Sequence, residues 1–419
     1  MSLNETPSGE RPHIVFFGVR NAGKSSLVNA VTGQALAVVS PVAGTTTDPV
    51  RKAMELAPAG PVLVVDTPGI DDTGAVGELR VRQALRALDQ ADVAVLVVDA
   101  GRGMTPFDHQ LRQAFQEKGV PYVVAWNKAD VAGGPASAPP LEGAGSGPTA
   151  RAEEGDAQIR VSALTGEGVR QLKELLAATI VVGGAKGAAG PGNPLVADLL
   201  TPGDVVVLVI PLDSAAPKGR LILPQQQVMR DVLEAGAFPC AAGVEGLPAL
   251  LDMLPRPPRL VVTDSQAFGA VAAAVPADVL LTSFSILMAR YKGGLPAQLT
   301  AVRALEALSD GSIVLIAEGC THHRQCNDIG TVKLPEWIRQ IGGANPQFAF
   351  TSGREFPDDL SPYAAVVHCG GCMLNRQEMQ SRLRRAAAQG VPATNYGMVI
   401  ARAHGILPRA LAPLGIAAP

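Results

Sequence analysis

The sequence has little excess charge, few aromatic residues and no long apolar run. Its 35 Lys and Arg residues face 38 Asp and Glu residues, for a formal net charge of −3, and only 4% of residues are aromatic. A chain without a basic excess is not typical of proteins whose main partner is nucleic acid. The longest apolar runs, at 93–98 and 205–210, have the length of a β-strand and are too short to span a membrane. We therefore expect neither nucleic acid nor a membrane as a partner.

Cysteine is also scarce, and its distribution is uneven. Four of the 5 cysteines lie in the last quarter of the chain, at Cys320, Cys326, Cys369 and Cys372, whereas Cys240 stands alone. An odd number of cysteines, after a first segment MSLNETPSGERPH that has no apolar stretch, predicts a reducing, cytoplasmic location. A disulfide framework would spread cysteines along the chain, so their crowding favours a metal site. Cys240 reads as an ordinary thiol, and Cys326 does too, although it could serve as a ligand.

Strand-like apolar runs alternate with helical patterns through most of the 419 residues, which predicts an α/β protein with parallel sheets. No segment recurs at a fixed period. Composition and Gly/Pro-rich stretches divide the chain into an N-terminal domain at 1–180, a linker at 181–194, a middle domain at 195–290 and a C-terminal domain at 291–419. Residues 132–157 have low complexity and read as a flexible insertion in the first domain.

A phosphate-binding motif, GVRNAGKS, follows the apolar run at 13–17 and precedes a helical pattern. It fits G-x-x-x-x-G-K-[ST] from Gly18 to Ser25, a loop whose backbone amides surround phosphates at a helix N-terminus. Lys24 would reach the β- and γ-phosphates, and Ser25 would bind Mg²⁺. Strand, loop and helix agree here, which makes the motif more specific than its letters alone.

Three more motifs follow strand-like runs in the order expected of a GTPase. Asp66 of DTPG would hold Mg²⁺ through water, and the amide of Gly69 would sense the γ-phosphate. Asp130 of NKAD can accept hydrogen bonds from guanine N1 and N2, a donor pair that adenine lacks, and the SAL segment at 162–164 would present an amide to guanine O6. The run AGTTTD at 43–48 reads as a mobile switch, with Thr46 reaching Mg²⁺. The predicted site for GTP or GDP comprises Gly18, Asn21, Ala22, Gly23, Lys24, Ser25, Ser26, Thr46, Asp66, Gly69, Asn127, Lys128, Asp130, Ser162, Ala163 and Leu164.

The first 180 residues resemble the potassium-activated GTPases of the tRNA-modification and ribosome-assembly group. Asn21 matches the asparagine that binds a monovalent cation in that group, and Ile70 stands where Ras-like enzymes carry the glutamine that positions water. The resemblance implies a slow GTP hydrolase stimulated by K⁺, in which the cation does the electrostatic work of an arginine finger. The residues expected to carry catalysis are Asn21, Lys24, Thr46 and Gly69.

A second site is predicted from the cysteines near the C-terminus. Cys320 follows the apolar run SIVLIA, and Cys369 and Cys372 follow AAVV, so all three fall at the carboxyl ends of predicted strands, where α/β sheets gather ligands. His322, His323 and His368 are nearby candidates for a fourth ligand. The spacing leaves three interpretations open: a structural Zn²⁺, an iron–sulfur cluster, or a redox-active pair that would account for Cys369 and Cys372 alone.

The same cysteines carry a resemblance to the FeFe-hydrogenase maturation GTPases, the scaffold members of a trio of maturases. The segments APKGRLILPQ, VVTDSQAFG, LTSFSILMARYKG, THHRQCNDIG and HCGGCMLNR all match the pattern of that family. The resemblance implies a GTPase domain, a middle dimerisation domain and a C-terminal domain whose Cys320, Cys369 and Cys372 bind a 4Fe–4S cluster with a variable fourth ligand.

The resemblance also implies a function and partners. The family receives a diiron precursor from two radical-SAM maturases and delivers it to apo FeFe-hydrogenase, and it acts as a homodimer. The alternative is a GTPase switch of the ribosome or tRNA class that carries a structural zinc domain, and a third interpretation is a redox-sensing protein with a vestigial G domain. The balanced charge disfavours the second and the intact guanine motifs disfavour the third.

Overall fold

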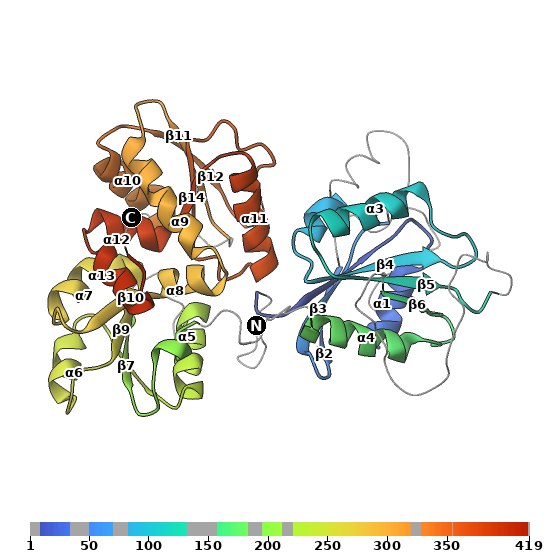
Figure 1. Cartoon of the computed structure of the whole chain (residues 1–419), viewed down its shortest axis with the longest axis horizontal. Coiled ribbons are helices and arrows are strands. Elements are labelled where there is room, and N and C mark those ends of the chain that lie inside the picture. The colour runs from blue at the N-terminus through green and yellow to red at the C-terminus, as the bar shows by residue number, and fades with distance from the viewer. Residues whose placement is uncertain are drawn as a thin grey trace. The chain divides into compact units, whose positions relative to one another are not determined.

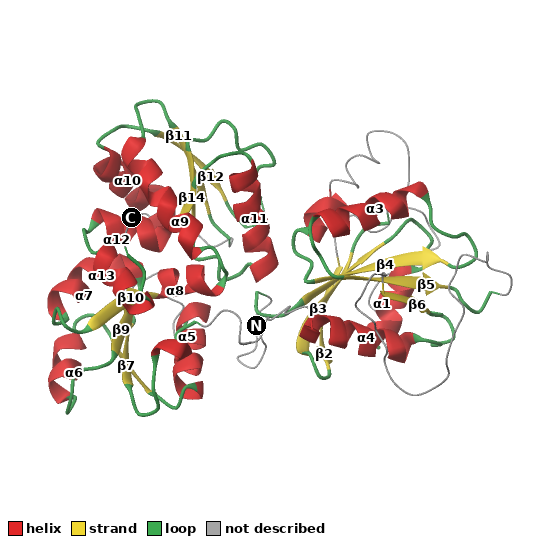
Figure 2. Ribbon diagram, viewed as in Figure 1, coloured by secondary structure: helices red, strands yellow, loops and turns green. Residues whose placement is uncertain are grey.

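The computed structural model describes residues 9–33, 50–69, 83–131, 157–182, 195–211, 221–319, 328–353 and 355–417. The chain forms two compact units, Met1–Ala188 and Ala189–Pro419, and each is described here by itself (Figures 1 and 2). Among the described helices, none combines the length and the apolar character that crossing a membrane requires.

The first unit is built on a sheet of six strands in the order β2-β3-β1-β4-β5-β6. The strands are β1 (His13–Phe17), β2 (Val50–Leu56), β3 (Gly60–Asp66), β4 (Val93–Asp99), β5 (Tyr122–Asn127) and β6 (Ala157–Arg160). All neighbouring pairs are parallel except β2 and β3, which are antiparallel. The apolar runs in the sequence predict the parallel strands but not β2, which has charged residues at several positions and lies at the edge of the sheet.

Helices cover both faces of this sheet because successive residues of the buried strands point to opposite faces. On one face, α1 (Lys24–Thr32) and α4 (Val169–Val182) pack against Ile14 and Phe16 of β1. On the other face, α3 (Pro106–Glu117) packs against Val15 and Phe17. The connections from β1, β3 and β5 all leave the carboxyl edge of the sheet, so the sequence motifs that follow these strands meet there.

The second unit contains two parallel sheets of four strands. The first has the order β10-β9-β7-β8 and the second β12-β11-β13-β14. The strands are β7 (Val205–Val209), β8 (Phe238–Ala242), β9 (Leu260–Thr263), β10 (Leu280–Ser283), β11 (Ile313–Ala317), β12 (Gln347–Thr351), β13 (Ala365–His368) and β14 (Ala393–Asn395). The longer helices are α5 (Leu223–Glu234), α6 (Leu247–Met253), α7 (Phe268–Ala274), α8 (Phe284–Tyr291), α9 (Leu295–Val302), α10 (Leu334–Gly342), α11 (Arg376–Ala388), α12 (Tyr396–Ala403) and α13 (Leu407–Leu411). The predicted α/β class is confirmed.

The two sheets share one topology, which corrects the expectation that no segment recurs. If the strands of each sheet are numbered along the chain, their order across both sheets is second, first, third, fourth, so the second strand lies at an edge. The fourth strand and its two following helices also agree in sequence, TSFSILMARYKGGLPAQL at 282–299 against TNYGMVIARAHGILPRAL at 394–411. Ser283 and Asn395, at matching positions, each cap the next helix through the amide three residues later. The middle and C-terminal domains are thus two versions of one fold.

The two domains exchange equivalent helices. Helix α9 follows the middle domain in sequence but packs on β14, whereas α13, its counterpart at the C-terminus, packs on β10 of the middle domain. One hydrophobic cluster runs through both domains and includes Val207, Leu281, Leu299, Val367 and Leu411. A continuous core with reciprocal helix exchange holds the two sheets as one body.

Candidate nucleotide and metal sites

The phosphate-binding loop lies between β1 and α1, and its backbone requires residues with unusual conformational freedom. Gly23 has φ 86° and Asn21 has φ 63°, in the left-handed region that only Gly and a few polar residues adopt readily. A side chain at Gly23 would overlap the Asn127 amide, and one at Gly18 would overlap the Val97 carbonyl oxygen. The loop is therefore held close to β4 and β5, with its amides at the N-terminus of α1.

Asp66 ends β3 directly beside this loop. Its Oδ2 accepts a hydrogen bond of 2.6 Å from Ser25 Oγ, and Lys24 Nζ lies 3.9 Å from its Oδ1. Burial raises the pKa of Asp66, although Lys24 and Ser25 act in the opposite direction. Its Oδ1 is buried and has no hydrogen-bond partner among the described residues. A hydroxyl and a carboxylate with an unsatisfied oxygen are the ligand types that Mg²⁺ prefers, so these residues fit the ion.

The guanine motifs are linked to the phosphate loop and to one another. Asn127 donates from Nδ2 to the Ala22 carbonyl oxygen at 2.9 Å, and its Oδ1 accepts from the Ala163 amide at 3.0 Å. Ser162 Oγ donates to Asp130 Oδ1 at 2.6 Å. The structure thus brings the predicted residues of the first, third and fourth motifs together at one edge of the sheet.

Lys128 is positioned by a residue that the sequence analysis missed. It has φ 63°, and its Nζ donates to Asp99 Oδ2 at 2.7 Å. Burial alone would raise the pKa of Asp99, but the hydrogen bonds from Lys128 and from the Gly101 amide hold it below its ordinary value. Asp99 ends β4, next to β5 in the sheet, so its place beside NKAD could have been anticipated from strand order alone.

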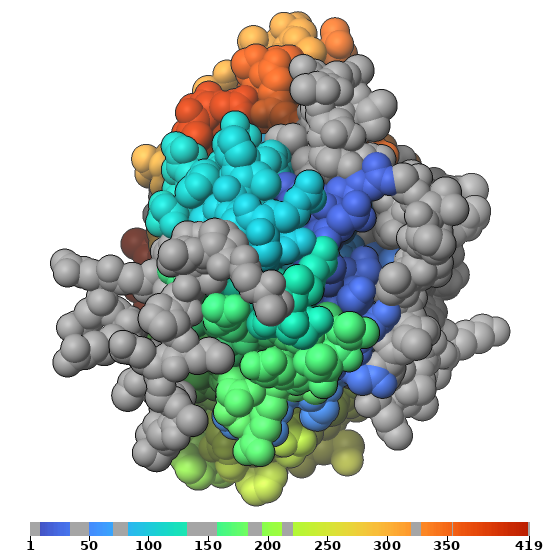
Figure 3. Space-filling view, turned by 90° about the vertical axis from the view of Figure 1, so that its right-hand side faces the viewer, coloured from blue at the N-terminus to red at the C-terminus, as the bar shows by residue number. Residues whose placement is uncertain are grey.

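The remaining nucleotide residues are only partly described. The Gly69 backbone comes close to Arg20, because a Cβ at Gly69 would lie 3.2 Å from Arg20 Cα. Thr46 and Ile70 lie outside the described residues. Strand β4 points toward the right-hand side of Figure 1, which is the side that faces the viewer in Figure 3. On that side the blue, N-terminal part of the chain is exposed beside the cyan and green parts.

In the C-terminal domain, Cys369 directly follows β13, which pairs with β11. The amides of Gly319 and Gly371 lie 3.0 Å and 3.3 Å from Cys369 Sγ and donate to it. Burial raises the pKa of Cys369 to about 11, and it raises that of Cys372 as well. A half-buried thiol that receives two amide hydrogen bonds, with a second cysteine three residues later, fits metal ligation, in which the metal displaces the thiol proton.

Cys320, Cys326 and His322 lie outside the described residues, so the predicted third thiolate and one candidate fourth ligand are not part of this geometry. Within the described part of the chain, no group of three or more His, Cys, Asp or Glu side chains is arranged to hold a metal ion. Gly319, the residue before Cys320, is described, and its hydrogen bond to Cys369 Sγ joins the end of β11 to the cysteine pair.

His368 is engaged on both sides of its ring. Nδ1 lies 2.9 Å from the Cys369 carbonyl oxygen and donates to it, so Nε2 is the nitrogen that accepts from Arg382 Nη1 at 3.0 Å. Burial, with the Arg382 charge, lowers the pKa of His368 to about 3, which keeps the ring neutral. Ligation of a metal by His368 would require breaking one of these hydrogen bonds. In this arrangement the side chain links the end of β13 to α11.

Two further polar residues near the cysteine pair were not predicted. Tyr396, at the start of α12, donates to Glu318 Oε1 at 3.3 Å, and burial raises the pKa of Tyr396. Glu318 follows β11 and is 5% exposed. Their positions follow from the parallel sheet, because β11, β13 and β14 end at the same edge.

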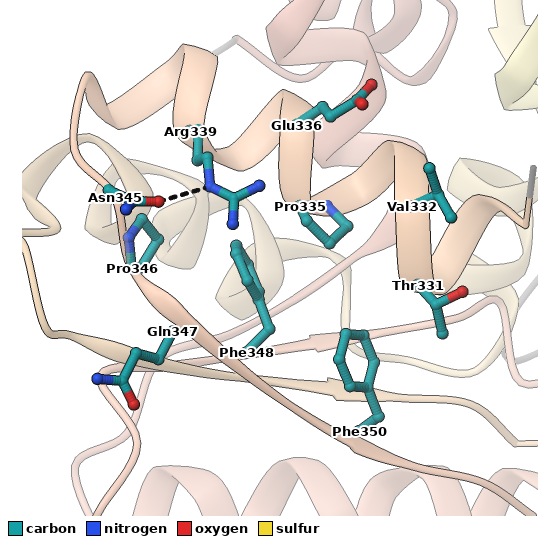
Figure 4. Close-up of a pocket in the computed structure, with 10 residues that line it drawn as sticks. All are labelled: Thr331, Val332, Pro335, Glu336, Arg339, Asn345, Pro346, Gln347, Phe348 and Phe350. Carbon is teal, nitrogen blue, oxygen red and sulfur yellow. Dashed lines mark hydrogen bonds between the residues drawn. The ribbon is translucent and has the colours of Figure 1, made fainter.

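The C-terminal domain also has an open cleft of about 600 Å³ beside its edge strand β12. Arg339 of α10 donates to Asn345 at 2.8 Å and lies over the Phe348 ring, with Phe350 farther along the strand (Figure 4). None of the residues lining the cleft belongs to the predicted nucleotide or cysteine site.

Comparison with known families assigns each part of the chain. Residues 195–293 match the hydrogen maturase F dimerization domain, and residues 296–413 match the hydrogen maturase F tetramerization domain. Residues 13–128 match the 50S ribosome-binding GTPase family. The chain belongs to the hydrogen maturase F family. The predicted resemblance is thereby confirmed, as is the order of a P-loop GTPase domain followed by two α/β domains. The dimerization and tetramerization domains indicate that the protein forms oligomers.

Two curated relatives each match about two fifths of the chain. The tRNA modification GTPase MnmE of Burkholderia mallei (strain SAVP1) is 37% identical over 165 residues, which cover 39% of this chain and 34% of the relative. MnmE of Laribacter hongkongensis (strain HLHK9) is 35% identical over 168 residues, 40% of this chain and 34% of the relative. The chain thus spans about a third of the length of these relatives.

Two solved structures are similar to part of the chain. The probable GTP-binding protein engB is 24% identical, covers 41% of this chain and 99% of its own, and has a TM-score of 0.30. Era of Aquifex aeolicus is 20% identical, covers 58% of this chain and 98% of its own, and has a TM-score of 0.34. The family match at 13–128 and the site geometry indicate a GTPase domain, for which GTP, GDP and Mg²⁺ are the expected ligands.

Proposed function

We propose that this chain is the GTPase scaffold that carries the diiron precursor of FeFe-hydrogenase. In this role it receives the precursor from two radical-SAM maturases and delivers it to the apo-enzyme as a cytoplasmic homodimer. The observation that carries the proposal is the union, in one chain, of a GTPase domain with the dimerization and tetramerization domains of hydrogen maturase F. The ribosome-binding and tRNA-modification relatives account for the first domain only.

The resident cofactor of this proposal is a 4Fe–4S cluster held by Cys320, Cys369 and Cys372. The support from the described residues is a half-buried cysteine pair at a carboxyl sheet edge, with amide donors directed at Cys369 Sγ. When bound, a cluster with three thiolates would supply one iron position open to an exchangeable ligand. His322 remains a candidate for that ligand, whereas His368 would have to give up a hydrogen bond.

The proposed GTPase is slow and is stimulated by K⁺ bound at Asn21. The support is the exposed position of Asn21 in the phosphate loop and its left-handed backbone conformation. The protein's own groups divide the work: Lys24 and Ser25 hold phosphate and Mg²⁺, Asp66 orients the metal, and Asp130 selects guanine.

The proposal is tested by anaerobic reconstitution of the full chain with ferrous iron and sulfide. We expect a brown protein with about four iron and four sulfide per chain and a reduced-state EPR signal of a 4Fe–4S cluster. The reconstituted protein, incubated with the two maturases, should then activate apo-hydrogenase in a hydrogen-evolution assay. A colourless protein that takes up one zinc per chain and no cluster would instead establish a structural zinc domain and end the scaffold proposal.

A further inference from the structure

A lysine at the end of the dimerization-domain match, which covers 195–293, reaches into the cysteine loop of the C-terminal domain. Lys292 directly follows α8, where the chain crosses from the middle domain to the exchanged helix α9. Its side chain is 3% exposed, which is unusual for an ammonium group and requires compensating partners.

The partners of Lys292 bracket one of the two cysteines. Its Nζ donates to the Gly371 carbonyl oxygen at 2.6 Å and also to the Leu374 carbonyl oxygen. Cys372 lies between these two residues, so the ammonium group closes the turn that carries the thiol. The turn favours glycine at position 371, because Gly371 has φ 62° and a Cβ there would overlap the end of the Met379 side chain.

The junction is held from the other direction as well. Gln380 of α11 donates from Nε2 to the Lys292 carbonyl oxygen at 3.2 Å. Lys292 is therefore fixed by the C-terminal domain through its backbone and fixes the cysteine loop through its side chain. At the matching position of the second repeat, His404 lies against Gly269 of α7, the helix after β9 in the middle domain. Both crossover residues thus contact the segment that follows the third strand of the opposite domain, a loop in one case and the start of α7 in the other.

We propose that Lys292 is a positioning residue for the proposed cluster site, holding the 369–374 loop in its ligating conformation and placing a buried positive charge beside the thiolates. This inference rests on the proposed function for the cluster itself. A thiolate-ligated cluster is anionic, and its reduction potential depends on nearby charge and on hydrogen bonds around the sulfurs. Because Lys292 directly follows α8 and lies within the dimerization-domain match, the properties of the cluster would depend on the contact between the two domains.

The test compares Lys292→Met, which keeps the length of the side chain and removes its charge and donors, with the unmodified full-length chain. In metal-free protein, we expect amide exchange across 369–375 and alkylation of Cys372 to become roughly ten- to a hundredfold faster, the range that the loss of hydrogen bonds to a charged group predicts. After reconstitution, an EPR-monitored redox titration should give a more negative midpoint potential, because the reduced cluster has lost a neighbouring positive charge.

Arg409→Met is the matched control. Arg409 is another cation that joins the two domains, donating to the Ala272 and Val275 carbonyl oxygens at 3.0 Å and 2.9 Å, and neither acceptor is in the cysteine loop. This variant should leave loop exchange, Cys372 alkylation and the midpoint potential unchanged. Lys292→Gln provides a second variant that can still donate to one carbonyl but has no charge, and its potential should shift in the same direction as that of Lys292→Met.

If amide exchange and Cys372 alkylation are unchanged in metal-free Lys292→Met, Lys292 does not order the 369–374 loop. If the midpoint potential is unchanged in both Lys292 variants, the charge of Lys292 does not act on the cluster. Equal effects of the Arg409 and Lys292 variants would show only general coupling of the domains and would also overturn the proposal. The metal-free measurements do not require a cluster, so they separate failure of the loop role from failure of the proposed function.

Discussion

At the scale of single residues, the nucleotide site rests on groups whose chemistry is set by their surroundings. Asp130 is an example, because Ser162 Oγ donates to its Oδ1 and fixes the orientation of the carboxylate. Asp66 is another, because burial penalises its charge while one of its oxygens has no hydrogen-bond partner among the described residues. Each of these features leads to a change that can be measured with purified protein.

Asp130→Asn should weaken GTP binding roughly ten- to a hundredfold and improve binding of xanthosine triphosphate. The reason is that an amide offers one acceptor and one donor where the guanine edge presents two donors, and hydrogen bonds to a charged group are worth about this factor. Direct titration with both nucleotides checks the prediction, and tighter binding of the xanthine nucleotide serves as the control for a folded site. Equal GTP affinity in the two proteins would contradict the assignment of Asp130.

Asn21→Gly should remove the advantage of K⁺ over Na⁺ in GTP hydrolysis. Glycine tolerates the backbone conformation at φ 63°, so this variant removes the carboxamide without straining the loop, as alanine would. In the unmodified chain the advantage of K⁺ should not exceed the arginine-finger range of roughly 10³–10⁵-fold. GDP affinity is the control and should be unchanged. If the ratio of rates in the two salts survives the substitution, Asn21 does not hold the cation.

Asp66→Asn should abolish most Mg²⁺-dependent hydrolysis, by more than roughly a hundredfold, because the metal loses a charged oxygen at the phosphates. The same change should raise the melting temperature of the nucleotide-free protein, since burial favours the neutral form of this carboxyl group. Phosphate release and thermal unfolding of the same preparation measure the two effects. A lower melting temperature would show that the hydrogen bond from Ser25 outweighs the cost of burying the charge.

At the scale of elements, strand ends decide where the motifs meet. Asn395 is the N-cap residue of α12, and its side chain makes two hydrogen bonds. Its Oδ1 accepts from the Met398 amide at 2.9 Å, and its Nδ2 donates to the Ser285 carbonyl oxygen of the middle domain at 3.0 Å. Ser283 caps α8 at the matching position with a shorter side chain. Ser283 thus serves as a helix cap, whereas Asn395 is a cap that also joins the two domains.

Asn395→Ala should lower the stability of the second unit by about 2 kcal/mol, about 1 kcal/mol each for the cap and for the bridging hydrogen bond. Asn395→Ser keeps the cap and should lose only the bridging part. Urea unfolding followed by Trp337 fluorescence measures the difference, in a Trp126→Phe background so that the other tryptophan, in the G domain, does not contribute. Equal losses in the two variants would contradict the division into two functions.

Much at this scale could be predicted from sequence, and the remainder has identifiable reasons. The strands carrying the GTPase motifs were predictable because each is a continuous apolar run that ends at a polar turn. Strand β2 was missed because residues such as Arg51, Lys52 and Glu55 hide its alternation. The repeat was missed because its functional loops diverged, with TDSQ after one third strand and HCGG after the other. Contacts such as Lys292 to Gly371 join distant segments, and spacing alone cannot reveal them.

At the scale of the whole molecule, the chain combines two separately built units. The G domain closes its own core within Met1–Ala188, and the repeated domains share theirs within Ala189–Pro419. All predicted nucleotide residues lie in the first unit and all predicted cluster ligands lie in the second. Separate cores allow one site to be damaged without unfolding the other.

Cys320→Ala, Cys369→Ala and Cys372→Ala should therefore each deplete the proposed cluster while GTP turnover stays within about twofold of the unmodified chain, since surface and remote changes rarely alter a separately folded domain by more. Each substitution removes one of three thiolates. Cys240→Ala is the matched control, because Cys240 lies on β8 of the middle domain, and it should retain full iron. His322→Ala should also retain iron, and a change in its EPR spectrum would identify the fourth ligand.

Iron per chain, reduced-state EPR and phosphate release should be measured on the same preparations, so that the two sites are compared in one population of molecules. Full iron content in all three cysteine variants would refute the assignment of the site. A fall in GTP turnover in step with iron loss would contradict the independence of the units. It would mean that the state of the cysteine site reaches the phosphate loop, and thus that binding of the cluster and binding of GTP are thermodynamically coupled in both directions.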